Sequence, residues 1–181
     1  MAGMMEKIAS RVPARWLAVS LMAMAVAACS GGEQGVITAS TGNPVIVLSE
    51  GTCDVTCPVY DMTLHPDGTY LLNGVRFVKT TGVSEGALGT DAWKKAEQAL
   101  EASDFWHLAP DQTSSDQPSC QPGTPTATIT WRTAEGRQKT LKYRPGCGGS
   151  EGRTLIPALR AAMQFDTLVW TDERFAPDGS R

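Results

Sequence analysis

Two short strand-like segments flank a turn at residues 66–68. Val59–Leu64 alternates between apolar and polar residues, and Thr69–Leu72 resumes the strand after the turn Pro66-Asp67-Gly68. Alternation with a period of two is typical of strands with one buried face. A three-residue loop with its glycine in the left-handed region would place Met62 opposite Leu72, whereas a two-residue loop would put them on different faces. The sequence therefore predicts a β-hairpin with a fixed register.

The same pattern recurs later in the chain. Thr126–Thr133 and Gln138–Arg144 both alternate, and a turn that ends at Gly136 joins them. A three-residue loop pairs Ile129 with Leu141, so that the apolar side chains of both strands share one face. We therefore predict a second hairpin of the same type.

Helical periodicity appears in two places. Asp91–Ser103 and Thr154–Phe165 carry apolar residues at helical spacing, with Thr90 as the expected N-cap of the first helix. Pro157 fits the second helix if it lies in the first turn. With Val45–Leu48 as a further apolar strand, the sequence predicts an α+β fold, in which a small antiparallel sheet carries two helices on one face.

The opposite face of that sheet is expected to be polar and basic. Its residues come mainly from the second hairpin, and they form the candidate binding face. The members of this face are Thr128, Thr130, Arg132, Lys142 and Arg144, with Thr63 and Thr140 on the same side.

Four cysteines follow Cys29, and an even number in an oxidising compartment favours disulfides. Four cysteines allow three pairings. The register of the second hairpin brings Cys147 close to Cys120, which leaves Cys53 to pair with Cys57. By the loop-closure model the long link contributes about 3–4 kcal/mol and the short one about 2 kcal/mol.

Two other uses of these cysteines stay open. Cys53 and Cys57 could exchange thiols and disulfides, although their spacing is C-x₃-C and the chain lacks the βαβ pattern of thioredoxin-like folds. Four cysteines could also bind zinc, but the second pair is widely spaced for a zinc knuckle. Structural disulfides are the favoured interpretation, and no metal or cofactor is expected.

The N-terminal segment is typical of a secretory signal peptide. Lys7, Arg11 and Arg15 precede the apolar run Trp16–Ala28, which is shorter than the about 20 residues that a membrane span needs. Cys29 follows small residues, and this junction resembles the lipobox of bacterial lipoproteins. The resemblance implies cleavage before Cys29 and acylation of this residue, with palmitate among the expected chains. Ser30 after the lipidated cysteine implies sorting to the outer membrane, facing the periplasm.

Cleavage would leave an acidic mature chain. The leader holds three of the 16 Lys and Arg and one of the 19 Asp and Glu, so the formal net charge falls from −3 to −5. This charge argues against nucleic acid as a partner. The expected organisation is a signal peptide at 1–28, a lipidated cysteine and flexible tether at 29–43, one α+β domain at 44–170 and a polar tail at 171–181.

Several stretches carry a family resemblance. They are Gly51–Tyr60 with its Cys-Pro-Val-Tyr element, the turn at 66–69, Arg76–Lys79, Ser103–Trp106 and Gly146–Gly149. Together they resemble the bacterial domain-of-unknown-function family 6438, over most of 45–170. The family occurs in secreted and lipid-anchored proteins, and the resemblance implies no activity.

The sequence therefore favours a non-enzymatic envelope protein. We expect it to be anchored to the membrane by lipid and to bind another envelope protein or a wall component through the candidate binding face. One alternative is a thiol–disulfide oxidoreductase that uses Cys53 and Cys57. Another is an inhibitor of a periplasmic enzyme. His65 and His107 are expected to be solvated or capping residues.

Overall fold

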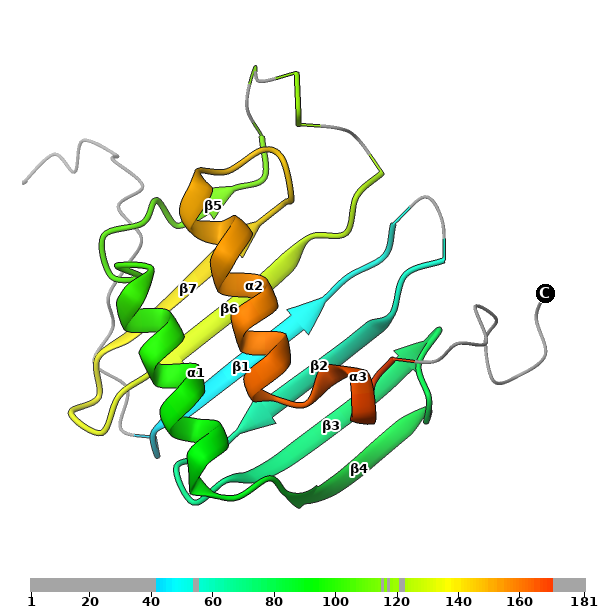
Figure 1. The fold of residues 1–181 in the computed structure, drawn as a ribbon, viewed down its shortest axis with the longest axis vertical. Coiled ribbons are helices and arrows are strands. Elements are labelled where there is room, and N and C mark those ends of the chain that lie inside the picture. The colour runs from blue at the N-terminus through cyan, green and yellow to red at the C-terminus, as the bar shows by residue number, and fades with distance from the viewer. Residues whose placement is uncertain (1–41, 54–55, 115, 117, 121–122, 171–181) are drawn as a thin grey trace, which may run out of the picture. The chain divides into compact units, whose positions relative to one another are not determined.

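Seven strands form one sheet in the described part of this computed structural model, which covers residues 42–170 except 54–55, 115, 117 and 121–122. The strand order is β4-β3-β2-β1-β6-β7-β5, and every neighbouring pair is antiparallel except β5 with β7 (Figure 1). The elements, in chain order, are β1 Val45–Glu50, β2 Val59–Leu64, β3 Thr69–Arg76, β4 Gly82–Ala87, α1 Thr90–Ala102, β5 Asp111–Gln112, β6 Ala127–Arg132, β7 Gln138–Tyr143, α2 Ser150–Ala162 and α3 Phe165–Leu168. The predicted α+β class is confirmed.

The first hairpin has the predicted register. Met62 pairs with Leu72 across β2 and β3, and Gly68 has a φ of 82°. Asp67 fixes the turn, because its Oδ1 accepts hydrogen bonds from the backbone N–H and the hydroxyl of Thr69, at 2.9 and 2.7 Å. These hydrogen bonds also lower the pKa of Asp67.

The second hairpin also has the predicted register. Ile129 pairs with Leu141 and Ala127 with Tyr143, and Gly136 has a φ of 81°. A positive φ of this size is accessible to glycine at little steric cost, so the third position of each loop needs this residue.

Strand β1 joins the two hairpins into one sheet. Leu48 pairs with Met62 of β2 on one side and with Ile129 of β6 on the other. Strand β1 is central and places apolar side chains on both faces of the sheet. Ile46 and Leu48 are buried against the helices, while Val45 and Val47 lie on the other side.

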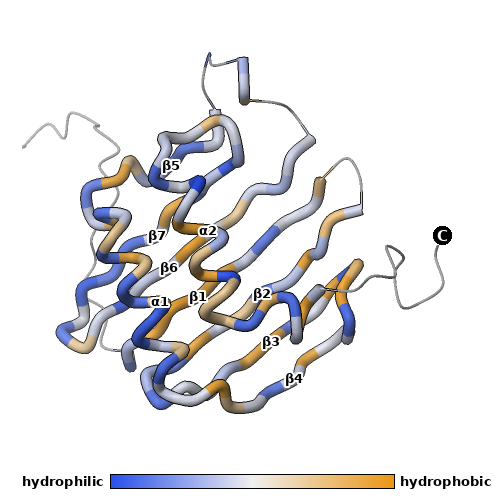
Figure 2. Tube along the Cα trace, in the orientation of Figure 1, coloured by the Kyte–Doolittle hydropathy of each residue, from blue (hydrophilic) through white to orange (hydrophobic). Residues whose placement is uncertain are grey.

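Helices α1 and α2 cover one face of the sheet, which we call the inner face (Figure 1). Figure 2 shows apolar positions, in orange, recurring along the strands and helices. The inner face and the two helices share one hydrophobic cluster. Its largest fully buried side chains are Tyr60, Tyr143, Phe105, Ile46, Leu48, Met62, Leu64, Leu72, Leu100, Ile129, Leu141 and Leu155.

Two predictions about the helix starts are wrong. Thr90 is the first residue of α1, and Gly89, with a φ of 81°, takes the N-cap position without a side-chain hydrogen bond. Helix α2 begins at Ser150 instead of Thr154, so Pro157 lies in its interior. Pro157 is on the exposed side of α2. It has no backbone N–H for the carbonyl one turn earlier in the helix, but water can donate a hydrogen bond to that carbonyl.

The early start of α2 depends on a close contact between helix and sheet. A Cβ atom at Gly152 would lie 2.0 Å from Cε2 of Tyr143, so only glycine lets this turn of α2 pack on the Tyr143 ring. Upstream of the helix, the backbone N–H of Gly149 donates to Oε1 of Gln112 at 3.1 Å. Both contacts come from β5 and β7, which explains why local periodicity did not reveal them.

Candidate functional surface

The outer face of the sheet, opposite the helices, carries the residues of the candidate binding face. Thr128, Thr130 and Arg132 alternate with buried residues along β6, and Lys142 does so along β7. The hydroxyl oxygens of Thr130 and Thr140 lie 2.8 Å apart, so the two side chains form a cross-strand hydrogen bond. Lys142 is exposed beside them.

Arg132 is already engaged within the fold. Its Nε donates to the carbonyl of Asn43 at 2.7 Å, and its Nη1 donates to Oε1 of Gln138 at 3.2 Å. The guanidinium therefore holds the segment that leads into β1. Arg132 lies on the predicted face, but its substitution would disturb the fold as well as the surface.

The basic end of this face has an acidic neighbour on β5. Arg144 follows β7 and is half-buried, and Asp111 pairs with Lys142. Hydrogen bonds from Thr113, chiefly from its hydroxyl, lower the pKa of Asp111, and the charges of Lys142 and Arg144 lower it further. The face is therefore polar with mixed charge near β5.

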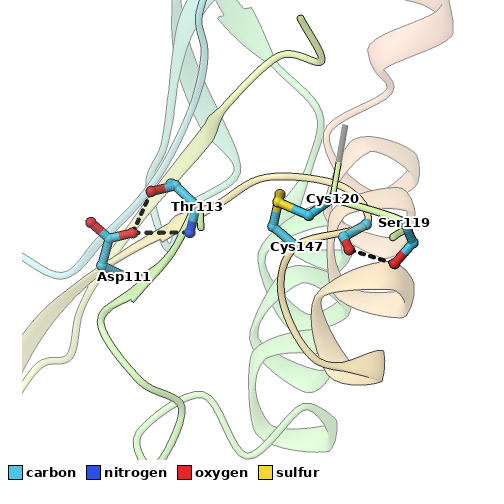
Figure 3. The surroundings of a disulfide bond; sticks show 6 residues. Asp111, Thr113, Ser119, Cys120 and Cys147 are labelled. Atoms are coloured by element: carbon cyan, nitrogen blue, oxygen red, sulfur yellow. Dashed lines mark hydrogen bonds between the residues drawn. A yellow bond between two sulfur atoms is a disulfide. The ribbon is translucent and has the colours of Figure 1, made fainter. Parts of the chain in front are cut away.

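The four downstream cysteines form two disulfides, Cys53–Cys57 and Cys120–Cys147. Figure 3 shows the second, which links the segment after β5 to the segment before α2. Next to it, the hydroxyl of Ser119 donates to the carbonyl of Gly146 at 2.7 Å. A disulfide sulfur is not a thiolate ligand, so the zinc alternative lacks its donors in this structure.

A buried ion pair joins α2 to the end of β1. The Arg160 guanidinium donates two hydrogen bonds to Glu50, from Nε to Oε1 at 3.0 Å and from Nη2 to Oε2 at 2.5 Å. The side chain of Glu50 is 3% exposed and that of Arg160 is 34% exposed. Burial lowers the pKa of Arg160, but the hydrogen bonds and charge of Glu50 raise it more, so the net shift is upward.

Tyr60 completes this cluster as the cross-strand partner of Glu50. Burial, followed by the charge of Glu50, raises the pKa of Tyr60, while Arg160 opposes the shift. The phenol therefore stays neutral at physiological pH. We did not predict this cluster from the sequence. Glu50 continues the inward positions of Ile46 and Leu48, and a charged residue at such a position is the signal that could have revealed it.

Lys139 is a second inward-facing charge that was not predicted from the sequence. It is 8% exposed, and its Nζ donates to the carbonyls of Phe105, Trp106 and Leu108 at 2.8, 3.0 and 2.5 Å. Burial lowers the pKa of Lys139, and the charge of Arg137 lowers it further. Each of the three N–H donors of the ammonium group has a carbonyl acceptor in the segment that follows α1. Lys139 therefore holds the end of this helix to the sheet.

The other titratable groups that the structure describes form no candidate metal site. His107 lies exposed, with Nδ1 2.6 Å from Oδ1 of Asp104. Within the described ranges, His, Cys, Asp and Glu form no group of three or more that could hold a metal ion. None of the helices that the structure describes is long and apolar enough to cross a membrane. Cys29 lies outside the described residues.

Comparison with known proteins places the chain in a family without assigning an activity. Residues 44–162 match the family model described as a domain of unknown function, DUF6438. A search of curated proteins finds no match. The matched segment spans more than half of the chain and contains the sheet, both long helices and all four disulfide-bonded cysteines. The chain belongs to the DUF6438 family.

Proposed function

We propose that this protein is a non-enzymatic binding module of the bacterial envelope, which binds another envelope protein or a wall component through the outer face of β6 and β7. The observation that carries this proposal is the one-sided packing of the sheet. Both long helices lie on the inner face, and no described element covers the outer face, which is polar along β6 and β7 (Figure 1). A rigid sheet that presents polar groups to solvent is a suitable support for a binding site.

The chemistry of that face suits a polar partner. Threonine hydroxyls both donate and accept hydrogen bonds, and the pair of Thr130 and Thr140 is already oriented by its own hydrogen bond. Lys142 adds an exposed positive charge next to them. We therefore expect the partner to present carboxylates or other acceptors opposite Lys142.

The groups that could perform catalysis have structural partners instead. Lys139 is bound to three carbonyls, Arg160 is paired with Glu50, and Cys53 is bonded to Cys57. Perturbed pKa values mark functional sites when the groups line a cleft, but structural ion pairs perturb pKa values too. These contacts support a binding role over an enzymatic one.

The proposed location in the cell is inferred from the N-terminal sequence. Cleavage before Cys29 and acylation of this residue would hold the domain at the outer membrane, with residues 30–43 as a tether that reaches about 45–50 Å when extended. Each buried CH₂ of an acyl chain contributes about 0.8 kcal/mol to the membrane affinity.

Replacement of Cys29 by serine tests the proposed membrane location. We expect Cys29→Ser to move the protein from the membrane fraction to the soluble fraction of lysed cells, because serine has no sulfur to which a lipid could be attached. Immunoblots of the two fractions measure the change, and Cys53→Ser is the matched control that should stay in the membrane fraction. A Cys29→Ser protein that remains in the membrane fraction would contradict the lipid anchor.

Charge reversal at Lys142 tests the binding face. We expect Lys142→Glu to reduce recovery of the partner at least tenfold in a quantitative pull-down from envelope extract, and in co-sedimentation with purified wall sacculi if the partner is the wall. Lys95→Glu on the exposed side of α1 is the control, since it makes the same charge change away from the sheet. Equal recovery with both variants would reject this face.

A further inference from the structure

Strand β4 forms one edge of the sheet, and its free edge presents unpaired backbone groups. The register pairs Tyr70 with Gly86, and the N–H of Leu88 donates to the carbonyl of Gly68 at 2.8 Å. In an antiparallel ladder the backbone groups of alternate residues point to alternate sides. The even-numbered residues of β4 therefore bond β3, and residues 83, 85 and 87 turn their N–H and C=O groups outward. Figure 1 shows no described element beyond β4 on that side.

This edge lacks most of the features that protect sheet edges from pairing. Proteins usually guard an exposed edge with proline, lysine, a bulge or a covering element. Strand β4 has the sequence GVSEGA, with neither proline nor lysine, and its pairing with β3 has no register shift. Its one charge, Glu85, is exposed on the outer face.

An apolar patch lies on the outer face beside this edge. Val83 is 71% exposed, Val75 is 54% exposed and Leu71 is 42% exposed. Val83 pairs with Asn73, which lies between Leu71 and Val75 on β3, so the three side chains adjoin one another. A hollow of about 630 Å³ lies along the same strands, lined in part by Tyr70, Glu85 and Gly86. A strand added at β4 would extend the sheet next to Val83 and Glu85, at the margin of both features.

We propose that β4 binds an extended segment of another envelope protein as an additional antiparallel strand, with a basic side chain opposite Glu85 and an apolar side chain opposite Val83. The outward backbone groups supply the hydrogen bonds, and the side chains of Val83 and Glu85 select the sequence. This surface goes beyond the proposed function, because β3, β2 and β1 separate it from β6.

The charge on β4 favours a different protein over a second copy of this chain. Two β4 strands paired about a symmetry axis at residue 85 would place two Glu85 carboxylates directly opposite each other. Like charges at directly opposed positions destabilise a strand pair. A lysine or arginine at that position instead forms a favourable cross-strand pair.

A synthetic peptide tests the proposal on the full mature chain. The probe is TITKTVT with blocked ends, whose lysine faces Glu85 and whose valine faces Val83 when it pairs antiparallel. We expect saturating peptide to slow hydrogen exchange at the amides of Val83, Glu85 and Ala87 at least tenfold, and to leave the amides of β6 unchanged. The control peptide TITETVT should bind at least tenfold more weakly. Absence of protection at these three amides would overturn the proposal.

Two variants separate edge pairing from other binding. Ala87→Pro removes one outward N–H without removing a bond to β3, so we expect it to weaken peptide binding while the chain stays folded. Glu85→Lys should reverse the preference between the two peptides, and it remains informative if Ala87→Pro fails to fold. An unchanged preference in Glu85→Lys would overturn the proposal. So would a dimer, detected by light scattering, that Ala87→Pro converts to monomer, because a second copy would then occupy the edge.

Discussion

Replacement of Arg160 by leucine is expected to lower the free energy of unfolding by about 3 kcal/mol. The change leaves the carboxylate of Glu50, which is 3% exposed, without its bidentate partner in the core. Removing one member of a buried pair typically costs about 3–5 kcal/mol, and the partial exposure of Arg160 places this pair at the lower end. Equilibrium unfolding in urea measures the loss.

The double variant Glu50→Leu with Arg160→Leu distinguishes a buried charge from lost packing. We expect it to recover most of the stability, because two apolar side chains can replace a buried pair at little cost. Arg153→Leu is the matched control, since Arg153 lies exposed on the same helix and should change stability by less than about 0.5 kcal/mol. If the double variant is as unstable as Arg160→Leu, the unpaired Glu50 carboxylate is not the cause of the lost stability.

Removal of the Cys120–Cys147 disulfide is the second large effect that we expect. Cys120→Ser with Cys147→Ser should lower the free energy of unfolding by about 3–4 kcal/mol, because the bond closes a loop with a sequence separation of 27. The same double change at Cys53 and Cys57, with a separation of 4, should cost about 2 kcal/mol. Both variants are compared by urea unfolding under non-reducing conditions. A larger loss at Cys53 and Cys57 would show that loop closure does not govern these bonds.

The hairpins could be predicted because alternation and turn length together leave one register. A shift of one residue would have moved Met62 and Leu72, or Ile129 and Leu141, to different faces. The same parity placed Thr128, Thr130 and Lys142 on the outer face. Local sequence was sufficient here because each pair is close in the chain.

Features that depend on distant contacts could not be predicted in the same way. The start of α2 depends on the fit of Gly152 to Tyr143, and the tolerance of Pro157 depends on its exposed position. Strand β4 was missed because its sequence has two glycines and little apolar content, so only its pairing with β3 defines it. Pairing overrides weak local propensity in such edge strands.

The candidate surface was predicted more completely than the environment of its residues. Arg132 was placed on the correct face, but its hydrogen bond to the carbonyl of Asn43 depends on the neighbouring strand β1. Lys139 lies on the same inward side of β7 as Leu141 and Tyr143. Its charge can be buried there because Nζ donates hydrogen bonds to three carbonyls that follow α1, and these distant partners could not be predicted. Charged residues at inward positions of predicted strands therefore merit the search for a buried partner.

Photo-crosslinking in living cells tests the binding role of the outer face most directly. A photoreactive amino acid would replace Thr128, which pairs with Lys142 on the outer face, or Lys95 on α1 as the control. We predict that position 128, and not position 95, crosslinks to a defined envelope protein or to wall material, and that Lys142→Glu in the same chain removes this product. No product at position 128, or the same products at both positions, would contradict a binding role for the face of β6 and β7.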